Sequence, residues 1–378
     1  MRRVLAALVV VLPALLVLWP PSQPGVAAHG PFSTAIQRQG RCQPATPPTV
    51  SPDWALDGLF YSQYGPGWVA GDATYSTALP GHREAFDFSD TLIGTAFPDG
   101  SASVTGVAPN SELIGQPPSL QSDYGGSFLA PKALIPDRRR ADRWEVAATL
   151  VEHGRQLVFV NEFVPGNPFG RFTGRSGVAV LTVPAAGLPR LRKVVPLPTG
   201  RQAQWGNAVT RVGGYRYVYG IDGNTATGAF YGMKVARVPV GRTADPAAWR
   251  YWDGRRWRAG ERHAARLSTT EALTGVTTQP GRPGLVAVSI PSGVRRDGTV
   301  DLSYACSPTG PWSRPVPVYS IPQVRQYPGE TAYIATFHPE LSSGGRLVVS
   351  YDVDNTQGLS VVAGDVHLYQ PQFLLVSL

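Results

Sequence analysis

The stretch QWGNAVTRVGGYRYVYG (204–220) decides the fold class, because it places two short runs rich in Val, Tyr and Thr on either side of a Gly-Gly pair. Similar runs recur along the chain, for example at 157–163, 177–183, 285–290 and 346–353. Short β-type runs bounded by Gly, Pro and Asp-Gly predict strands joined by turns. Since no segment shows helical periodicity beyond about two turns, the sequence predicts an all-β protein.

The predicted strands group into five units, at 54–125, 140–200, 201–265, 266–322 and 323–378. Trp68, Trp144 and Trp205 mark the openings of the first three units. Repeating units of roughly 40–70 residues with four strands each favour propeller blades over a sandwich. We therefore expect a single five-bladed β-propeller of four-stranded antiparallel blades over residues 54–378, with the last strand near 373–377 closing the ring against the N-terminal part of the chain.

The composition excludes several other classes. Gly and Pro number 42 and 36 among 378 residues, and 43% of the residues are hydrophobic while 16% are charged. This is too apolar for a disordered chain and lacks the heptads of a coiled coil. The formal net charge of +8 comes from scattered arginines and not from basic residues interleaved with stacking aromatics, so we expect no nucleic-acid partner.

The N-terminus has the three-part order of a secretory signal peptide. Arg2 and Arg3 precede an apolar run over 4–19, and the small residues Ala27 and Ala28 follow a Pro-Pro break. We expect cleavage after Ala28, so that 1–28 is the signal peptide; an uncleaved signal anchor is the alternative. Residues 29–53 are expected to form an irregular arm without a strand. The mature chain is then expected to be a monomer, secreted or associated with the cell envelope, with no membrane span.

Cys42 and Cys306 are the two cysteines of the chain. In an oxidising compartment two cysteines most simply pair, and this bridge would fasten the N-terminal arm to the body. Two unrelated buried thiols are the alternative. Neither cysteine has a second ligand at metal-binding spacing, and no phosphate loop or dinucleotide motif occurs, so we expect neither a metal site nor a cofactor.

Three pairs of segments carry a resemblance to a known family. They are GWVAGDATYS (67–76) with FDFSDTLIG (86–94), QWGNAV (204–209) with YRYVYG (215–220), and HPEL (338–341) with LVVSYDVDN (347–355). Together with the turn TGPWS (309–313), they resemble the five-bladed β-propeller family catalogued as DUF4185, a domain of unknown function, and related to the endo-D-arabinanases of glycoside hydrolase family 183.

This resemblance implies a secreted glycoside hydrolase that acts on furanosidic, arabinan-type linkages of a cell-envelope polysaccharide. Its motifs place the two catalytic acids on Asp72 and Asp90. The chain departs from the family at Asp87, where an apolar residue is usual, and at Ser89, where Gly is usual. We expect the extra carboxyl group of Asp87 to be directed away from the Phe88 side, toward solvent.

The spacing of the residues is compatible with the same acid pair, although by itself it favours two turn-capping aspartates. A hairpin symmetric about Pro80-Gly81 pairs positions whose numbers add to about 162, which sets Asp72 opposite Asp90. Two carboxyl groups that lie close together raise the pKa of one of them, as an acid and base pair requires. The alternative is that both aspartates cap Asx turns.

Further side chains at predicted inner-strand positions are expected to contact a glycan. They are Glu162, Trp205, Asn207, Tyr219, His338, Glu340, Tyr351 and Asp354, and Glu145 is a further candidate at the opening of the second unit. The alternative for His338 is a structural histidine, and for Glu340 a surface ion pair. The alternative function is a non-catalytic secreted propeller that binds cell-wall glycan, its expected partner in either case, on a platform of Trp205, Tyr219 and Tyr351.

Overall fold

The computed structural model describes residues 42–137, 143–164, 170–197, 203–224, 229–269, 272–291 and 298–378. The predicted signal peptide and the first part of the predicted arm lie outside these ranges. Within them, no helix is both long enough and apolar enough to span a bilayer.

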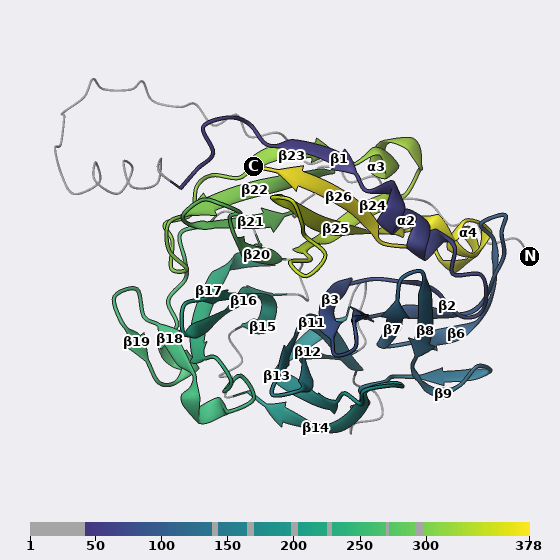
Figure 1. Cartoon of the computed structure of the whole chain (residues 1–378), viewed down its shortest axis with the longest axis horizontal. Coiled ribbons are helices and arrows are strands. Elements are labelled where there is room, and N and C mark those ends of the chain that lie inside the picture. Colours follow the sequence, from purple (N-terminus) through teal and green to yellow (C-terminus); the bar gives the residue numbers. More distant parts are fainter. Residues whose placement is uncertain are drawn as a thin grey trace, which may run out of the picture.

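Antiparallel sheets of four or five strands make up most of the described chain (Figure 1). The first sheet contains, in spatial order, β3 (Tyr75–Leu79), β4 (Arg83–Phe88), β7 (Ser111–Gln116) and β8 (Ser119–Asp123). The second contains β11 (Arg143–Glu152), β12 (Arg155–Val164), β13 (Arg171–Thr182) and β14 (Arg190–Pro196). The third contains β15 (Gln204–Val212), β16 (Tyr215–Asn224), β17 (Ala229–Pro239), β18 (Arg250–Trp252) and β19 (Trp257–Arg258).

Two more sheets complete this set. The fourth contains β20 (Gly275–Thr278), β21 (Leu285–Ser289), β22 (Thr299–Ala305) and β23 (Val316–Ser320). The fifth contains β24 (Glu330–Phe337), β25 (Arg346–Asn355), β26 (Gln372–Ser377) and β1 (Thr49–Pro52). The expectation of a mostly β protein with four-stranded antiparallel sheets is thus confirmed.

The first strands of these sheets, β3, β11, β15, β20 and β24, surround one central cavity. Each lies at the edge of its sheet and therefore pairs with one neighbour only. Apolar side chains of adjacent sheets fill the space between them, and the largest buried cluster joins Phe159 of the second sheet to Trp205 of the third. Gly206 permits this approach: its φ is 95°, and a Cβ atom there would lie 2.4 Å from Phe159, so a side chain is excluded at this position.

The two ends of the described chain meet in the fifth sheet. β26 pairs on one side with β25 and on the other with β1, where Thr49 lies opposite Ser377. The expected closure by the last strand is confirmed, while the expectation that the arm holds no strand is wrong. The physical reason is that β26 would otherwise expose an unpaired edge, and the arm supplies the missing hydrogen bonds.

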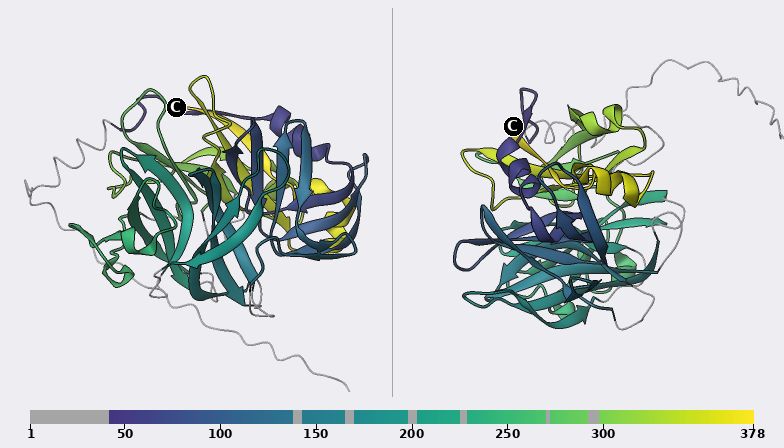
Figure 2. Two further views of the ribbon diagram at one scale, coloured as in Figure 1. Left: turned by 60° about the horizontal axis from the view of Figure 1, so that its bottom comes forward. Right: turned by 90° about the vertical axis from the view of Figure 1, so that its right-hand side faces the viewer.

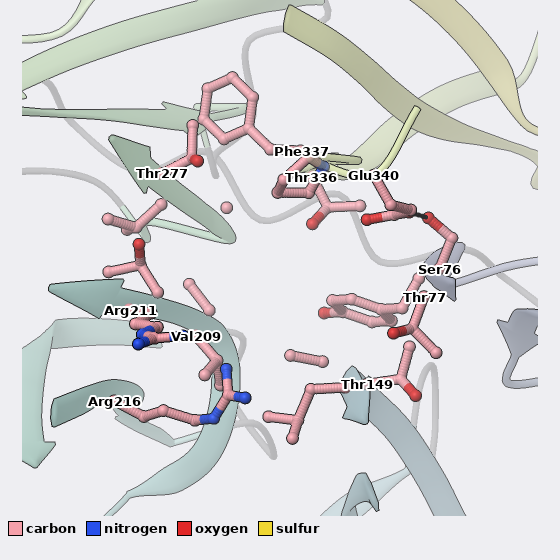
Figure 3. A pocket seen from close by; sticks show the side chains of 18 of the residues that line it. Ser76, Thr77, Thr149, Val209, Arg211, Arg216, Thr277, Thr336, Phe337 and Glu340 are labelled. Atoms are coloured by element: carbon pink, nitrogen blue, oxygen red, sulfur yellow. Dashed lines mark hydrogen bonds between the residues drawn. The ribbon is translucent and has the colours of Figure 1, made fainter. Parts of the chain in front are cut away.

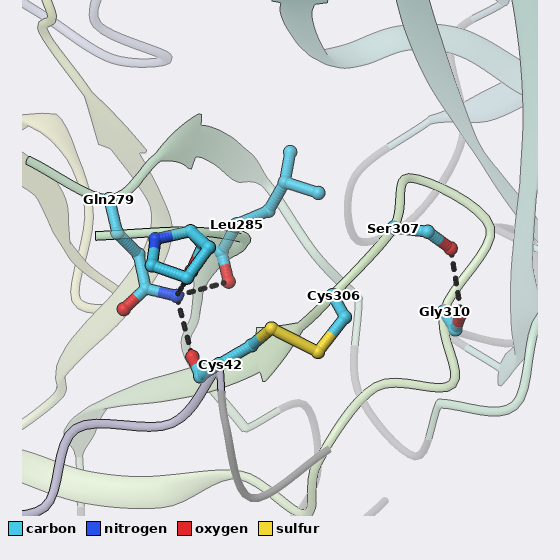
Figure 4. Close-up of a disulfide and its surroundings, with 7 residues drawn as sticks. Cys42, Gln279, Leu285, Cys306, Ser307 and Gly310 are labelled. Carbon is cyan, nitrogen blue, oxygen red and sulfur yellow. Dashed lines mark hydrogen bonds between the residues drawn. A yellow bond between two sulfur atoms is a disulfide. The ribbon is translucent and has the colours of Figure 1, made fainter. Parts of the chain in front are cut away.

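A disulfide joins this arm to the fourth sheet, as predicted (Figure 4). Cys42 and Cys306 have Cα atoms 5.4 Å apart. The amide nitrogen of Gln279 donates a hydrogen bond of 2.6 Å to the Cys42 carbonyl oxygen. The bridge therefore holds the segment that precedes β1 against the end of β22.

The first predicted unit holds more than one sheet. β2 (Gly65–Gly71), β5 (Thr91–Ala96) and β6 (Ala102–Ala108) form a separate three-stranded sheet, and β9 (Gly125–Ser127) pairs with β10 (Ala130–Lys132). Trp68, expected to open the inner strand, lies instead in β2 of the three-stranded sheet. That sheet packs against helices near the C-terminus, where Val69 and Leu92 meet Val362 (Figure 2).

Short helices lie in the connections between strands. They are α2 (Trp54–Tyr61), η1 (Pro246–Ala248), η2 (Glu261–His263), α3 (Pro322–Gln326), α4 (Leu359–Gly364) and η3 (Val366–Leu368). Asp53 caps the start of α2, because its carboxyl group accepts hydrogen bonds from the backbone N–H groups of Ala55 and Leu56.

Asp87 corrects another expectation. Its side chain does not reach solvent: it is 1% exposed and lies opposite Glu112 across β4 and β7. Gln156 of the second sheet donates a hydrogen bond of 2.7 Å to Glu112 and contacts of 3.2 and 3.3 Å to Asp87. The outward side of this hairpin is buried because the second sheet packs against it.

Candidate active site

The hairpin of β3 and β4 has the register predicted from the sequence. Tyr75 lies opposite Asp87 and Ser76 opposite Phe86, so the paired positions add to the predicted value. The pairing continues past the ends of both strands: the Asp72 N–H group donates to the Asp90 carbonyl oxygen at 3.2 Å, and the Ser89 N–H group donates to the Asp72 carbonyl oxygen at 2.8 Å. Asp72 and Asp90 are therefore neighbours at the start of β3.

Other acids converge on this pair from two further sheets. Glu145 lies at the start of β11, and Asp352 and Asp354 lie near the end of β25. We call Asp72, Asp90, Glu145, Asp352 and Asp354 the acid cluster. Their negative charges act on one another, since Asp90, Asp352 and Glu145 all raise the pKa of Asp72.

Hydrogen bonds orient the two catalytic candidates. The Tyr333 hydroxyl donates to Asp72 Oδ2 at 2.9 Å, while Asp72 Oδ1 has no hydrogen-bond partner among the described residues. Arg143 Nη1 lies 3.1 Å from Asp90 Oδ2, and Arg143 Nη2 lies 2.9 Å from Glu145 Oε1. The Arg143 guanidinium group thus pairs with two carboxylates, and the Tyr333 hydroxyl group forms a hydrogen bond with the carboxyl group of Asp72.

Burial and neighbouring charges give the carboxyl groups of the acid cluster different pKa values. Burial raises the pKa of Asp72 well above its usual value, and the adjacent carboxylates raise it further. Burial also raises the pKa of Asp90, but Arg143 opposes that rise. The pKa of Glu145 is raised to about 7 by burial, again against the pull of Arg143. Asp72 is therefore the carboxyl group best held protonated, and Asp90 is favoured as a carboxylate.

The site is open to solutes. The side chains of Arg143, Asp90 and Glu145 are 34%, 31% and 26% exposed, whereas Asp352 is 1% exposed. Asp352 accepts a hydrogen bond of 2.7 Å from the Thr74 hydroxyl. Its contribution is thus to position the segment that carries Asp72 and to add negative charge behind it.

The predicted stacking platform does not exist. Trp205 and Tyr219 are 0% exposed and Tyr351 is 2% exposed. The Trp205 indole N–H donates to Glu261 at 2.8 Å, and Tyr219 donates its hydroxyl to the Pro308 carbonyl oxygen at 2.9 Å. These rings face the packing between adjacent sheets, so no sugar ring can stack on them.

Two more of the predicted contacts are structural. Glu162 is fully buried and pairs with Arg175, whose side chain is 44% exposed. His338 is also 0% exposed; it contacts the hydroxyl groups of Ser76 and of Ser350. Burial lowers the pKa of His338 to about 3, so it is a neutral structural histidine, as the alternative held.

The remaining three candidates fall in different places. Asp354 belongs to the acid cluster. Asn207 lies in a bulge of β15 between Trp205 and Ala208 and donates to the Gln204 carbonyl oxygen at 2.6 Å. Glu340 accepts a hydrogen bond from Ser76 and lines the central cavity, not the acid cluster.

Sequence reasoning missed Arg143, Tyr333 and Asp352. Asp352 could have been found, because it lies two positions from Asp354 in a strand and so shares its face. Arg143 could have been found by the same rule, because it lies two positions from Glu145 in β11 and pairs with it. Its contact with Asp90 and the contact of Tyr333 with Asp72 carried no such signal, since both cross between sheets. In the described part of the chain, no cluster of three or more His, Cys, Asp or Glu side chains has the geometry of a metal site.

Comparison with known proteins assigns the chain to a family. Residues 53–377 match the family described as a domain of unknown function, DUF5005. The chain belongs to the DUF5005 family. No curated protein matches it.

Among solved structures, this DUF5005 protein resembles one from Bacteroides ovatus ATCC 8483 that is named as a candidate hydrolase. The two share 15% identity and superpose with a TM-score of 0.70 over 89% of this chain and 93% of the other. A xylan β-1,4-xylosidase from Bacillus halodurans C-125 gives a TM-score of 0.48 at 10% identity, over 83% of this chain and 53% of the other. The GH43_1 enzyme from Xanthomonas citri, solved with xylotriose, gives 0.45 at 13% identity, over 84% of this chain and 92% of the other.

Proposed function

We propose that this DUF5005 protein is a glycoside hydrolase, with Asp72 and Asp90 as its catalytic carboxyl groups, and that its five principal sheets are the blades of a propeller. The observation that carries the proposal is the partly exposed acid cluster at the start of β3 and β11, in which one carboxyl group is held protonated and another is paired with Arg143. Glycoside hydrolysis requires such a pair, because one carboxyl group must donate a proton while the other acts as base or nucleophile.

The geometry suggests a role for each residue. Asp72 donates its proton to the glycosidic oxygen as the bond breaks, and the hydroxyl of Tyr333 holds its other oxygen in place. Asp90, kept ionised by Arg143, either activates water or attacks the anomeric carbon. Glu145 also pairs with Arg143 and thereby partly offsets the positive charge that keeps Asp90 ionised. If Asp90 attacks the anomeric carbon, Asp72 recovers its proton from the water that hydrolyses the glycosyl-enzyme. If Asp90 activates water, Asp90 takes the proton of that water, and after product release Asp90 loses a proton to solvent while Asp72 gains one from it.

For the substrate we propose a furanosidic, arabinan-type polysaccharide of the cell envelope, reached after secretion. The support for this choice is the resemblance of the three motif pairs, of which the first contains both aspartates. The disulfide between Cys42 and Cys306 is compatible with an extracellular location. The non-catalytic alternative loses its support, because the aromatic platform that it needs is buried.

The experiment compares the parent with Asp72→Asn and Asp90→Asn on purified arabinan, xylan and galactan. Each substitution should slow release of reducing ends by about 10²-fold or more while leaving the melting temperature nearly unchanged. Asp301→Asn provides the matched control: Asp301 is a buried acid of β22, outside the acid cluster, that accepts a hydrogen bond from Thr299. Hydrolysis by the Asp72→Asn, Asp90→Asn double variant at the parental rate would exclude the proposed pair.

A further inference from the structure

The central cavity lies apart from the acid cluster. It occupies about 520 Å³ and is lined by the later parts of the inner strands, from Ser76 in β3 to Thr336 in β24. The acid cluster gathers instead at the beginnings of β3 and β11. We call this central cavity the distal cavity from here on, because it lies away from the acid cluster. Its size falls within the range of small-molecule sites.

Each of the five inner strands contributes a threonine to the distal cavity, and Figure 3 labels those of β3, β11, β20 and β24. These threonines are Thr77, Thr149, Thr210, Thr277 and Thr336. Thr149 accepts a hydrogen bond from Gln156 at 3.4 Å. The other four are only 5–8% exposed, and within the described ranges their hydroxyl groups make no hydrogen bond to protein. None of these hydroxyl oxygens is among the fully buried unpaired polar atoms of the described residues, so each can form a hydrogen bond with a solute in the cavity.

The backbone adds further donors and acceptors. Each inner strand is the edge of its sheet, and its free edge borders the cavity. An edge strand presents alternating N–H and C=O groups that no strand pairs with. The wall of the distal cavity is therefore rich in both donors and acceptors, arranged around a centre. A polyol, in which each hydroxyl both donates and accepts, matches this wall better than a group that can only accept.

Charge argues against an anion. Arg216 points into the cavity but is paired with Glu152. Arg211 on one side faces Glu340 on the other (Figure 3); because burial raises the pKa of Glu340 to about 7, this carboxyl group offsets the charge of Arg211 in part at neutral pH and fully at higher pH. Phe337 and Val209 supply apolar contact area of the kind that the C–H face of a sugar ring covers. The lining is thus polar, nearly neutral and partly apolar.

We propose that the distal cavity binds a neutral sugar of one or two residues through the hydroxyl groups of Thr77, Thr210, Thr277 and Thr336. This site is separate from the proposed catalytic pair and does not depend on the protein's being a hydrolase. Its occupant contacts all five sheets at once, so binding should also stabilise the ring of sheets.

The test uses the full chain with Asp72→Asn and Asp90→Asn, so that turnover cannot alter the probes. L-arabinose, D-arabinose, D-xylose and D-galactose are titrated separately and followed by saturation-transfer NMR and by the melting temperature. At least one sugar should bind saturably and raise the melting temperature. In the same background, Thr210→Val with Thr277→Val should weaken that binding roughly tenfold or more, because Val keeps the shape and removes two hydrogen-bonding groups.

Thr95→Val, in β5 of the three-stranded sheet, is the control and should leave sugar binding unchanged. If the double threonine variant does not fold, Thr77→Val tests the same wall from another sheet and should weaken binding severalfold. The proposal is overturned if none of the four sugars binds, if the threonine variants bind as tightly as the parent, or if sulfate occupies the cavity and the sugars do not. Since no readout involves hydrolysis, these outcomes stay distinct from failure of the proposed catalytic pair.

Discussion

The buried pair of Asp87 and Glu112 should make stability depend on pH, and Asp87→Asn should remove much of that dependence. Burial raises the pKa of Asp87 from 3.8 to about 6 and that of Glu112 well above its usual value. At pH values between the pKa of each group in the unfolded chain and its pKa in the folded protein, the folded protein binds more protons than the unfolded chain. The free energy of unfolding therefore falls as pH rises through this range. For Asp87 alone the shift of roughly two units corresponds to about 3 kcal/mol.

The amide introduced by Asp87→Asn can still hydrogen-bond to Glu112 but cannot ionise. At pH 4 ionisation of Asp87 should therefore contribute little to the difference in unfolding free energy between the variant and the parent. By pH 7 the difference in unfolding free energy between them should have changed in favour of the variant by about 3 kcal/mol. Comparing the change in this difference cancels contributions that do not depend on pH, such as small shifts in packing.

The assay is urea unfolding of both proteins at several pH values from 4 to 8, followed by tryptophan fluorescence. Asp99→Asn is the control, because Asp99 is an exposed acid whose pKa is lowered by hydrogen bonds from Ser101; any pH-dependent change that it causes has the opposite sign. A difference between Asp87→Asn and parent that stays constant across this range would refute the reasoning, since it would mean that the buried pair does not retain its protons.

Three other contacts lead to predictions that can each be tested by a separate measurement. Cys42→Ser should lower the free energy of unfolding by up to about 5 kcal/mol, because the bridge closes a loop with a sequence separation of 264; unfolding curves that do not respond to reductant would contradict this. Arg143→Met should raise the pKa of Asp90 by roughly one unit or more, since it removes a charge 3.1 Å away, and so shift the acidic limb of the pH–activity profile upward; an unmoved limb would argue against Asp90 as base or nucleophile. Deletion of residues up to Pro52 should expose the edge of β26 and promote self-association, which light scattering would detect; a monomeric, equally stable product would show that β1 is dispensable.

Much of the local structure could be predicted from the sequence. Alternating Val, Tyr and Thr between Gly-rich turns is a short-range pattern, and strand formation depends on it directly. The register of the β3 and β4 hairpin was predictable for the same reason, because a short turn leaves few ways to pair its flanks. The prediction of the bridge between Cys42 and Cys306 needed only a count of cysteines and the expectation of an oxidising compartment.

The composition of the site depended on tertiary structure. A sequence reveals which face of a strand is apolar, but not whether another sheet covers the second face. That is why Trp205 and Asp87 were expected to be accessible and are both buried. The same limit applies to the contact of Arg143 with Asp90 and to that of Tyr333 with Asp72, which form only after separate sheets converge. Residue types and hairpin register are local properties of the chain, whereas burial, charge pairing and the protonation of Asp72 arise from packing between sheets far apart in sequence.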